Sequence, residues 1–211
     1  MNDFMIFVEG IADKVFIRQY IAFIEGVPIR TISEEKIIQC SGRANLWVKK
    51  EVKANLSEAI DEGVTPLIIF DADASAEDTR EEIANELSAI NIPSNQYALF
   101  LFPNNQDAGD LETLLEHIVP PKNLPIFECW EKYEECLRHY ATPKVRPSPL
   151  PPLTTPARKT KIYGYLEALL GTSEAEKKKI KEASREYRNA EHWDLNAIYL
   201  NPLKQFLQPH L

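Results

Sequence analysis

The feature that most constrains the fold is the apolar run PLIIF at residues 66–70, which leads directly into Asp71 and Asp73. A short run with no polar residue is typical of a strand that is buried on both faces, as in a parallel sheet covered by helices. Such a strand needs neighbours on both edges and helices on both faces. The run therefore predicts an α/β fold, with two carboxylates where the strand ends.

Similar segments alternate along the first 120 residues. Strands are expected at 3–10, 36–42, 65–70 and 96–102, with helices at 12–24, 44–63 and 109–119. A further helix starts at Ser75 and turns Ile83, Leu87 and Ile90 inward, as their spacing indicates. Strands alternating with helices at this spacing predict a parallel sheet with right-handed crossovers.

The rest of the chain has a different character. A helix is expected at 128–140, and six prolines follow between residues 143 and 156, a composition typical of an extended connector. Short helices are predicted at 159–171, within 173–188 and at 201–207. We therefore predict an α/β domain over 1–142, a proline-rich connector over 143–158, and a helical extension over 159–211 that packs on the first domain.

Composition and charge narrow the class of protein. The 211 residues suit one compact domain with an appendage, and no run reaches the ~18 apolar residues of a membrane span. The acidic start is unlike a secretory signal, and three cysteines without a C-x-x-C pair favour a reduced, cytoplasmic protein without structural zinc.

The charge is unevenly distributed. Residues 144–188 hold eleven Lys/Arg and five Asp/Glu, a net +6, within a chain of net charge −8. The acidic remainder does not attract nucleic acid by bulk charge. The basic segment, including Lys177–Lys179 and Lys181, either faces the acidic domain and solvent or forms a phosphate-contacting surface.

Acidic side chains follow three of the predicted strands. Because ligands bind outside the carboxyl ends of parallel strands, these acids should meet at one edge of the sheet. The set comprises Glu9, Asp71, Asp73, Asp110 and Glu112. Two carboxylates about 4 Å apart repel by roughly 4 kcal/mol at a dielectric near 20, and protonation or a cation can relieve the repulsion. We expect Mg²⁺, with Mn²⁺ as an alternative, on Asp71 and Asp73.

Neighbouring residues fit a metal and phosphate site. Asp13 lies one helical turn beyond Glu9 and can point back at the same metal, and Gly10 leaves room for a phosphate to approach. Gly109 is expected to loosen the loop before Asp110. Arg43 can grip a phosphate with its forked guanidinium or pair with one of the acids.

Several alternatives stay open for these residues. Asp73 or Asp110 can be an ordinary helix N-cap, and Asp13 a solvated helix residue or a partner of the helix N-terminal dipole. The D-x-D-x-S pattern also occurs in haloacid-dehalogenase-type phosphatases, although there it ends the first strand, and D-x-D binds Mn²⁺ in nucleotide-sugar glycosyltransferases. His117 is expected to be structural or solvated.

Three segments together resemble the Toprim domain of primases, topoisomerases and OLD-family nucleases. They are VEGIAD at 8–13, IFDADAS at 69–75 and NQDAGDLETLL at 105–115. The G-D-x-E element resembles the OLD branch in particular. The segments at 102–119 and 193–207 also resemble uncharacterised bacterial Toprim-like proteins.

The resemblance implies a nuclease-like activity and assigns roles. Glu9 would be the general acid/base or a metal ligand, and Asp71 and Asp73 would bind the first Mg²⁺. The second metal would be completed by Asp13, Asp110 and Glu112. Lys159 or Lys161 would supply the downstream lysine of the OLD enzymes.

The resemblance implies hydrolysis of a nucleic-acid phosphodiester. The chain has no P-loop ATPase motif. The topoisomerase tyrosine domain is also absent, so a protein partner in trans or a stand-alone role follows. The alternative is a non-catalytic Toprim-like module that binds a nucleotide, nucleic acid or protein. Neither the nucleic acid nor an oligomeric state is indicated.

Overall fold

The computed structural model describes residues 4–141, 151 and 153–211. Four strands form one parallel sheet in the order β2-β1-β3-β4. Their bounds are β1 Met5–Val8, β2 Ile37–Gln39, β3 Pro66–Asp71 and β4 Ala98–Phe102. The predicted α/β fold is confirmed, and β1, β3 and β4 are adjacent, as convergence of the acids requires.

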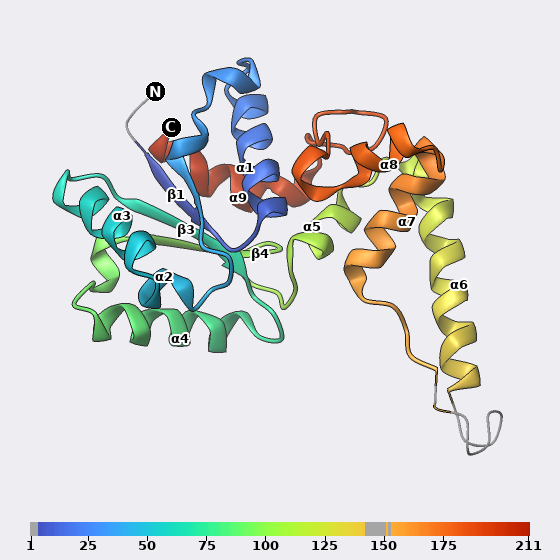
Figure 1. The fold of residues 1–211 in the computed structure, drawn as a ribbon, viewed down its shortest axis with the longest axis horizontal. Coiled ribbons are helices and arrows are strands. Elements are labelled where there is room, and N and C mark those ends of the chain that lie inside the picture. Colours follow the sequence, from blue (N-terminus) through green and yellow to red (C-terminus); the bar gives the residue numbers. More distant parts are fainter. Residues whose placement is uncertain (1–3, 142–150, 152) are drawn as a thin grey trace.

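Helices cover both faces of the sheet (Figure 1). The bounds are α1 Ile11–Ile24, α2 Asn45–Val48, α3 Lys50–Asp61, α4 Ala76–Ala89, α5 Leu111–His117 and α9 Asn201–Leu207. Helices α1, α5 and α9 pack on one face and α2, α3 and α4 on the other. The two-sided cover explains why β3 is apolar from Pro66 to Phe70: Leu67 and Ile69 face one layer, Ile68 and Phe70 the other.

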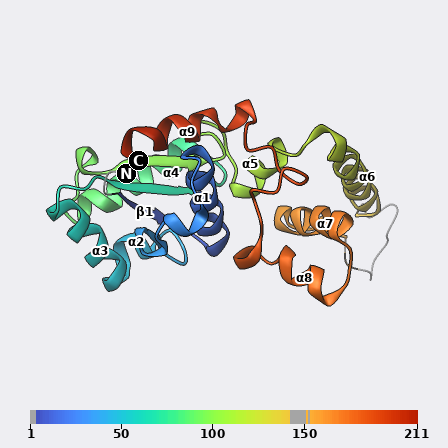
Figure 2. The same cartoon turned by 90° about the horizontal axis from the view of Figure 1, so that it is seen from above.

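Three more helices gather to one side of the sheet, beyond α5. They are α6 Leu124–Tyr140, α7 Arg158–Leu170 and α8 Glu174–Ile180. Both views show this group beside the sheet-bearing body (Figures 1 and 2). Trp130 of α6 packs against Gly164 of α7, where a Cβ would lie 2.7 Å from the indole ring. Glycine is therefore required there by close approach rather than by backbone conformation.

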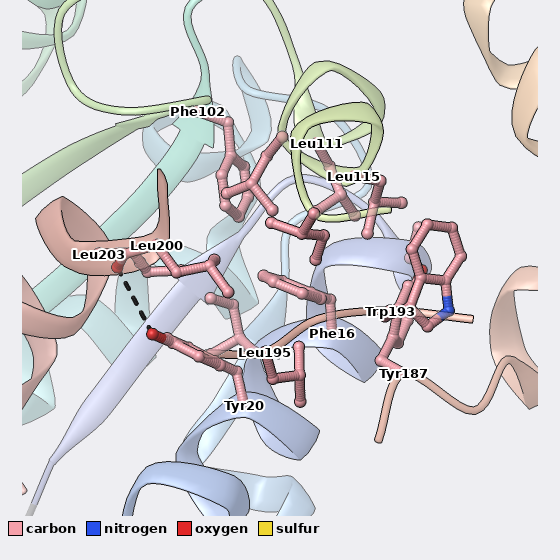
Figure 3. Close-up of a cluster of buried hydrophobic side chains, with 14 of the residues drawn as sticks. Phe16, Tyr20, Phe102, Leu111, Leu115, Tyr187, Trp193, Leu195, Leu200 and Leu203 are labelled. Atoms are coloured by element: carbon pink, nitrogen blue, oxygen red, sulfur yellow. Dashed lines mark hydrogen bonds between the residues drawn. The ribbon is translucent and has the colours of Figure 1, made fainter. Parts of the chain in front are cut away.

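Residues from the end of the chain complete the core over α1. Trp193, Leu195, Leu200 and Leu203 lie in one buried cluster with Phe16 of α1, as Figure 3 shows. Tyr187 stacks edge-on against the Phe16 ring at 5.2 Å between centroids. The Tyr20 hydroxyl donates to the Leu200 carbonyl at 3.4 Å. The residues after Ile180 thus share a core with the sheet.

Two predicted helices are shorter in the structure. The segment 44–63 divides into α2 and α3, because Lys49 has an extended backbone with ψ of 119°. The segment 173–188 is helical only to Ile180, and a short 3-10 turn, Glu182–Ser184, follows. Of the predicted connector, residues 143–150 and 152 lie outside the described residues, and α7 already begins at its last residue, Arg158. Within the described part of the chain, no helix has the length and apolar character to cross a membrane.

Candidate functional site

The predicted acids come from adjacent strands and meet at one edge of the sheet. Glu9 directly follows β1, Asp71 is the last residue of β3, and Asp110 immediately precedes α5. The Asp71 backbone N–H donates to Glu9 Oε1 at 3.3 Å. The carboxylate after the first strand therefore lies against the end of the third.

A backbone bridge joins the two loops that carry the other acids. Asp73 and Gly109 exchange two N–H···O=C hydrogen bonds of 2.8 Å each, and Leu111 N–H donates to Asp71 Oδ1 at 3.0 Å. Gly109 has φ of +142°, and a Cβ there would lie 2.6 Å from Thr113 Oγ1. The glycine thus permits close packing, and the prediction that it loosens the loop is wrong.

Asp13 points back to the start of its helix, as predicted. Its side chain is buried, and its Oδ2 accepts a 2.7 Å hydrogen bond from Gly10 N–H. The alternative of a solvated helix residue is wrong. Gly10 has ordinary extended backbone, and its N–H is already engaged by Asp13. Its role in phosphate binding stays a prediction.

Four of the acids form what we call the carboxylate cluster: Glu9, Asp13, Asp71 and Glu112. Burial, reinforced by the charges of Asp13 and Glu9, raises the pKa of Asp71 to about 9. Burial also raises the pKa of Asp13 to about 7, with Glu9 and Glu112 adding to the effect. Burial raises the pKa values of Glu9 and Glu112 in the same way. Without a cation, the cluster retains protons at neutral pH.

The cluster lacks the ion pairs that its neighbours Asp73 and Asp110 form. Within the described chain, no Lys or Arg side chain forms an ion pair with any of its four members. Asp73, in contrast, pairs with Arg43 at 3.0 Å, and Asp110 pairs with Arg158 at 3.2 Å. The cluster thus holds the carboxylates that lack a direct ion pair, although the charges of Arg43 and Arg185 act on Glu9 and Glu112.

The structure shows which partners Arg43, Asp73 and Asp110 have when no ligand is bound. Arg43 pairs with acids: with Asp73, and with Glu82 at 3.3 Å. Asp110 is the N-cap of α5, since its Oδ1 accepts from Thr113 N–H at 2.8 Å. Asp73 is not a cap, because Ser75 performs that function for α4.

The two candidate lysines lie on α7, and each forms an ion pair with a glutamate from another segment. Lys159 pairs with Glu182. Lys161 is buried, pairs with Glu116 at 2.8 Å and lies over the Phe127 ring. Neither lysine forms an ion pair with the cluster. The charge of Lys159 nevertheless lowers the pKa of Glu112 and so partly offsets the rise that burial causes.

Sequence reasoning missed a cation beside the cluster. Arg185 is 1% exposed, and its guanidinium donates to the Ile180 carbonyl and, at 3.3 Å, to the Tyr187 hydroxyl. Its charge opposes the rise in the pKa of Glu112. No local sequence pattern distinguishes this arginine from its exposed neighbours, because its burial depends on how residues 180–187 dock on α1.

His117 and the lysines of α8 form local contacts, and the phosphate-contacting surface on α8 stays a prediction. The His117 ring stacks on Tyr199 at 4.0 Å between centroids, and its Nδ1 lies 2.8 Å from the Thr113 carbonyl. Lys177 and Lys179 pair with Glu174 and Glu176 on the exposed side of α8. The structural expectation for His117 is confirmed.

The donor set of the cluster suits a hard cation. Carboxylate oxygens are the protein ligands that Mg²⁺ prefers, and it often takes only one or two of them while waters and substrate phosphates complete its coordination. Among the described residues, no three His, Cys, Asp or Glu side chains already stand in an arrangement that could hold a metal ion. Binding would therefore require Asp71 and its neighbours to turn toward a common point.

Comparison with known protein families shows which family the chain belongs to. A family model with the description "Protein of unknown function (DUF3226)" matches residues 3–210. The chain belongs to the DUF3226 family. The match includes the carboxylate cluster, the DUF3226 α/β body and the C-terminal segment that carries Arg185. No curated protein and no solved structure matches this DUF3226 chain.

The raised pKa values predict that the metal-free protein loses stability as pH rises. Asp71 is protonated in the folded state up to about pH 9 but ionises near 4 when unfolded, so the unfolding free energy falls through that window. Asp71→Asn removes this charge and keeps an oxygen for Leu111 N–H. We expect the thermal midpoint of Asp71→Asn in EDTA at pH 8 to exceed the wild-type value. The increase should be roughly 2–4 °C for each ~1 kcal/mol by which the unfolding free energy rises.

Circular dichroism melts between pH 5 and pH 9 measure this effect. The matched control is Asp61→Asn. Asp61 is exposed and is the last residue of α3. Because α3 leads into the start of β3, Asp61 lies at the edge of the sheet opposite to the cluster. This variant should follow the wild-type pH dependence. Equal pH slopes for wild type and Asp71→Asn would contradict the assignment of a raised pKa to Asp71.

Proposed function

We propose that the protein catalyses Mg²⁺-dependent hydrolysis of nucleic-acid phosphodiesters, with Mn²⁺ as an alternative metal. The observation that supports this proposal is the carboxylate cluster: one buried and three half-buried acids at the carboxyl edge of a parallel sheet, without an ion pair among the described residues. Four such acids destabilise the fold unless protons or cations neutralise them. Clusters of carboxylates with raised pKa values are found preferentially at functional sites, which supports a chemical role for this one.

The residues divide into ligands and proton-transfer groups. Asp71 and Asp73 would hold a first Mg²⁺, and Asp13, Asp110 and Glu112 a second. When bound, the metals would supply positive charge for the attacking and leaving oxygens. Glu9, whose pKa is raised by burial, is suited to take a proton from the attacking water. The resemblance to the Toprim domain of the OLD branch supports the same division.

Two arginines would change partners when the site is loaded. Arg43 pairs with Asp73, and Arg158 pairs with Asp110. If these carboxylates turn to a metal, both guanidinium groups become free to contact substrate phosphate oxygens, which they bind in a forked geometry. The predicted role of Arg43 as a phosphate contact thus belongs to the loaded state.

The setting of this activity follows from the sequence. We infer a cytoplasmic protein whose substrate is DNA or RNA, and which acts alone or with a protein partner in trans. Lys159 or Lys161 would serve as the downstream lysine only after release from its ion pair with Glu182 or Glu116.

One observation favours a second function. The ion pairs Asp73–Arg43 and Asp110–Arg158 already neutralise two of the predicted metal ligands. A non-catalytic module would retain such pairs and bind a nucleotide, nucleic acid or protein without turnover. The two functions differ in whether a divalent cation binds the cluster.

Thermal unfolding with and without metal tests the proposal. A cation that binds only the folded state stabilises it by ~2.7 kcal/mol at a concentration of 100 Kd, which raises the midpoint. We expect Mg²⁺ or Mn²⁺ to raise the midpoint of wild type and of Asp61→Asn but not of Asp71→Asn. Hydrolysis of single- and double-stranded DNA and RNA is then assayed with the same three proteins. Equal shifts in all three proteins, or hydrolysis by Asp71→Asn at the wild-type rate, would refute the proposed site.

A further inference from the structure

The loops after β3 and β4 carry most of the acids of the candidate site, and hydrogen bonds join these loops at two separate places. The first is the backbone bridge between Asp73 and Gly109. The second is a side-chain contact between Arg80 of α4 and Asn105, the third residue of the loop after β4. We call this contact the clasp. Neither of its residues belongs to the site that the sequence predicts.

Asn105 attaches its loop to the outer side of β4. Within the described part of the chain, β4 is an edge strand, so its outer side has no neighbouring strand. Asn105 N–H donates to the Leu101 carbonyl at 2.7 Å, and Leu101 N–H donates to Asn105 Oδ1 at 3.1 Å. The Asn105 backbone has φ of +70°, in the left-handed region that asparagine tolerates better than most residues. One residue thus satisfies both polar backbone groups of Leu101 and fixes the start of the loop.

Arg80 connects the same asparagine to α4. One guanidinium nitrogen of Arg80 donates to Asn105 Oδ1 at 2.8 Å and to the Asn105 carbonyl at 3.1 Å. Hydrogen bonds from a charged donor are roughly twice as strong as neutral ones, and the half-buried position of Arg80 limits competition from water. Helix α4 begins at Ala76, shortly after Asp73. The clasp therefore joins the two loops a second time, through the helix that follows the first of them.

The bridge and the clasp together close a ring. The ring runs from Asp73 through the start of α4 to Arg80, crosses to Asn105, follows the loop to Gly109 and returns to Asp73. Hydrogen bonds behind the ligands of a metal site orient those ligands and tune the metal that they hold. The ring therefore fixes the distance between the backbone segments that carry the acids.

The ligands themselves have little capacity to compensate for a displaced backbone. Asp71, Asp73 and Asp110 are aspartates, with a single methylene between backbone and carboxylate. Rotation of these side chains can bring oxygens together, but only around attachment points that the ring keeps in place. Mg²⁺ demands near-octahedral geometry with oxygens at about 2.0–2.1 Å, whereas Ca²⁺ accepts about six to eight oxygens at about 2.3–2.6 Å in adaptable arrangements. A backbone of fixed spacing thus favours the smaller and more demanding cation.

We propose that the clasp is a specificity-determining element of the candidate metal site, which keeps the two loops at the spacing of a Mg²⁺-sized ion and so discriminates against Ca²⁺. Arg80 and Asn105 act as positioning residues, because neither supplies a carboxylate ligand. The choice of cation rests on the proposed function, whereas the hold of the clasp on the loops does not.

Two variants, which we call the clasp variants, release the clasp from opposite sides. Asn105→Gly removes the acceptor side chain and accommodates φ of +70° without strain, and Arg80→Ala removes the donor from α4. The matched control is Asn123→Ala. Asn123 directly precedes α6 and donates to the Tyr165 hydroxyl at 3.0 Å and to the Glu191 carbonyl at 2.7 Å. The control therefore also loses side-chain hydrogen bonds but leaves both loops unchanged.

Amide hydrogen exchange in EDTA tests the hold of the clasp without any metal. Gly109 N–H donates to the Asp73 carbonyl and Leu111 N–H to Asp71 Oδ1, so both amides report on the separation of the loops. Each rate is taken relative to the amides of β3, which report on global unfolding. We expect both amides to exchange about tenfold faster in the clasp variants, and at the wild-type rate in the control.

Calorimetric titration with Mg²⁺ and with Ca²⁺ measures the choice of cation in the same proteins. Wild type and the control should bind Mg²⁺ more tightly than Ca²⁺. In the clasp variants, the ratio of the two dissociation constants should move toward Ca²⁺ by about tenfold, the lower end of what loss of a group behind the ligands costs. A loss of stability alone would weaken the binding of both cations and leave the ratio unchanged.

The outcomes distinguish a failed clasp from a failed metal site. Unchanged exchange in both clasp variants would overturn the hold of the clasp on the loops, whether or not a metal binds. Faster exchange with an unchanged cation ratio would overturn the specificity role and leave the proposed metal site intact. Binding of neither cation by wild type would refute the proposed function and, with it, the choice of cation. Faster exchange together with a shifted ratio is the expected result.

Discussion

Glu9→Gln is expected to lower the rate of Mg²⁺-dependent phosphodiester hydrolysis by about 10²–10⁴-fold, the usual contribution of a general base. Glutamine keeps the oxygen that accepts from Asp71 N–H and removes only the ability to take a proton. The fold should therefore be intact. Turnover under saturating metal and substrate measures the effect, with Asp61→Asn as the variant that retains wild-type turnover.

The pH profile provides a second readout for Glu9. A base must be deprotonated to act, and burial raises the pKa of Glu9 while the charge of Arg43 opposes the rise. Wild-type kcat/KM should therefore increase with pH through a limb that reports the ionisation of Glu9, and the limb should disappear in Glu9→Gln. A metal-induced thermal shift that also disappears in the variant would assign Glu9 to metal binding instead.

Trp193→Ala is expected to reduce the unfolding free energy by ~3–5 kcal/mol, as truncation of a buried tryptophan does. Trp193 is 1% exposed and packs against Tyr165 at 5.2 Å and Tyr187 at 6.0 Å between ring centroids. The side chain joins α7 to the residues that dock on α1. We expect the thermal midpoint to fall by roughly 6–20 °C, at 2–4 °C per kcal/mol.

Calorimetry distinguishes a shared core from an independent C-terminal domain. Six side chains near the end of the chain lie in the same buried cluster as β1, β3 and α1, so wild type and Trp193→Ala should each unfold in one cooperative transition. They are Tyr187, Trp193, Leu195, Leu200, Leu203 and Leu207. The control Ile198→Ala truncates a side chain that is 83% exposed and should change the free energy by less than ~0.5 kcal/mol. Two separate transitions in wild type would show that the extension folds independently.

The sheet was accessible from sequence because its signals are local. The run at 66–70 is apolar on both faces, and Ser75 with Asp78 marks the start of α4, where the Ser75 side chain caps the helix. Strand order was not accessible, since it depends on which crossovers pack best. The break at Lys49 was also missed, because apolar residues continue at helical spacing across it.

The sequence was sufficient to predict which residues form the candidate site, but not what surrounds each of them. Position after a strand predicts that Glu9 and Asp71 share an edge of the sheet. It does not predict that Asp13 is buried, that Asp73 bonds to Gly109 through the backbone, or that Arg185 faces Glu112. Those features depend on the docking of loops and of the C-terminal segment, and short-range sequence patterns carry no information about such contacts.

The position of α9 has a consequence for folding during synthesis. Leu203 and Leu207 of α9 lie in the cluster with Phe100 of β4, and Phe206 packs against the same ring at 5.4 Å. A nascent chain that has completed all four strands must still leave this face of β4 open to solvent. A ribosome-bound chain therefore exposes apolar surface that favours aggregation and chaperone binding until residues 200–207 emerge and close the sheet.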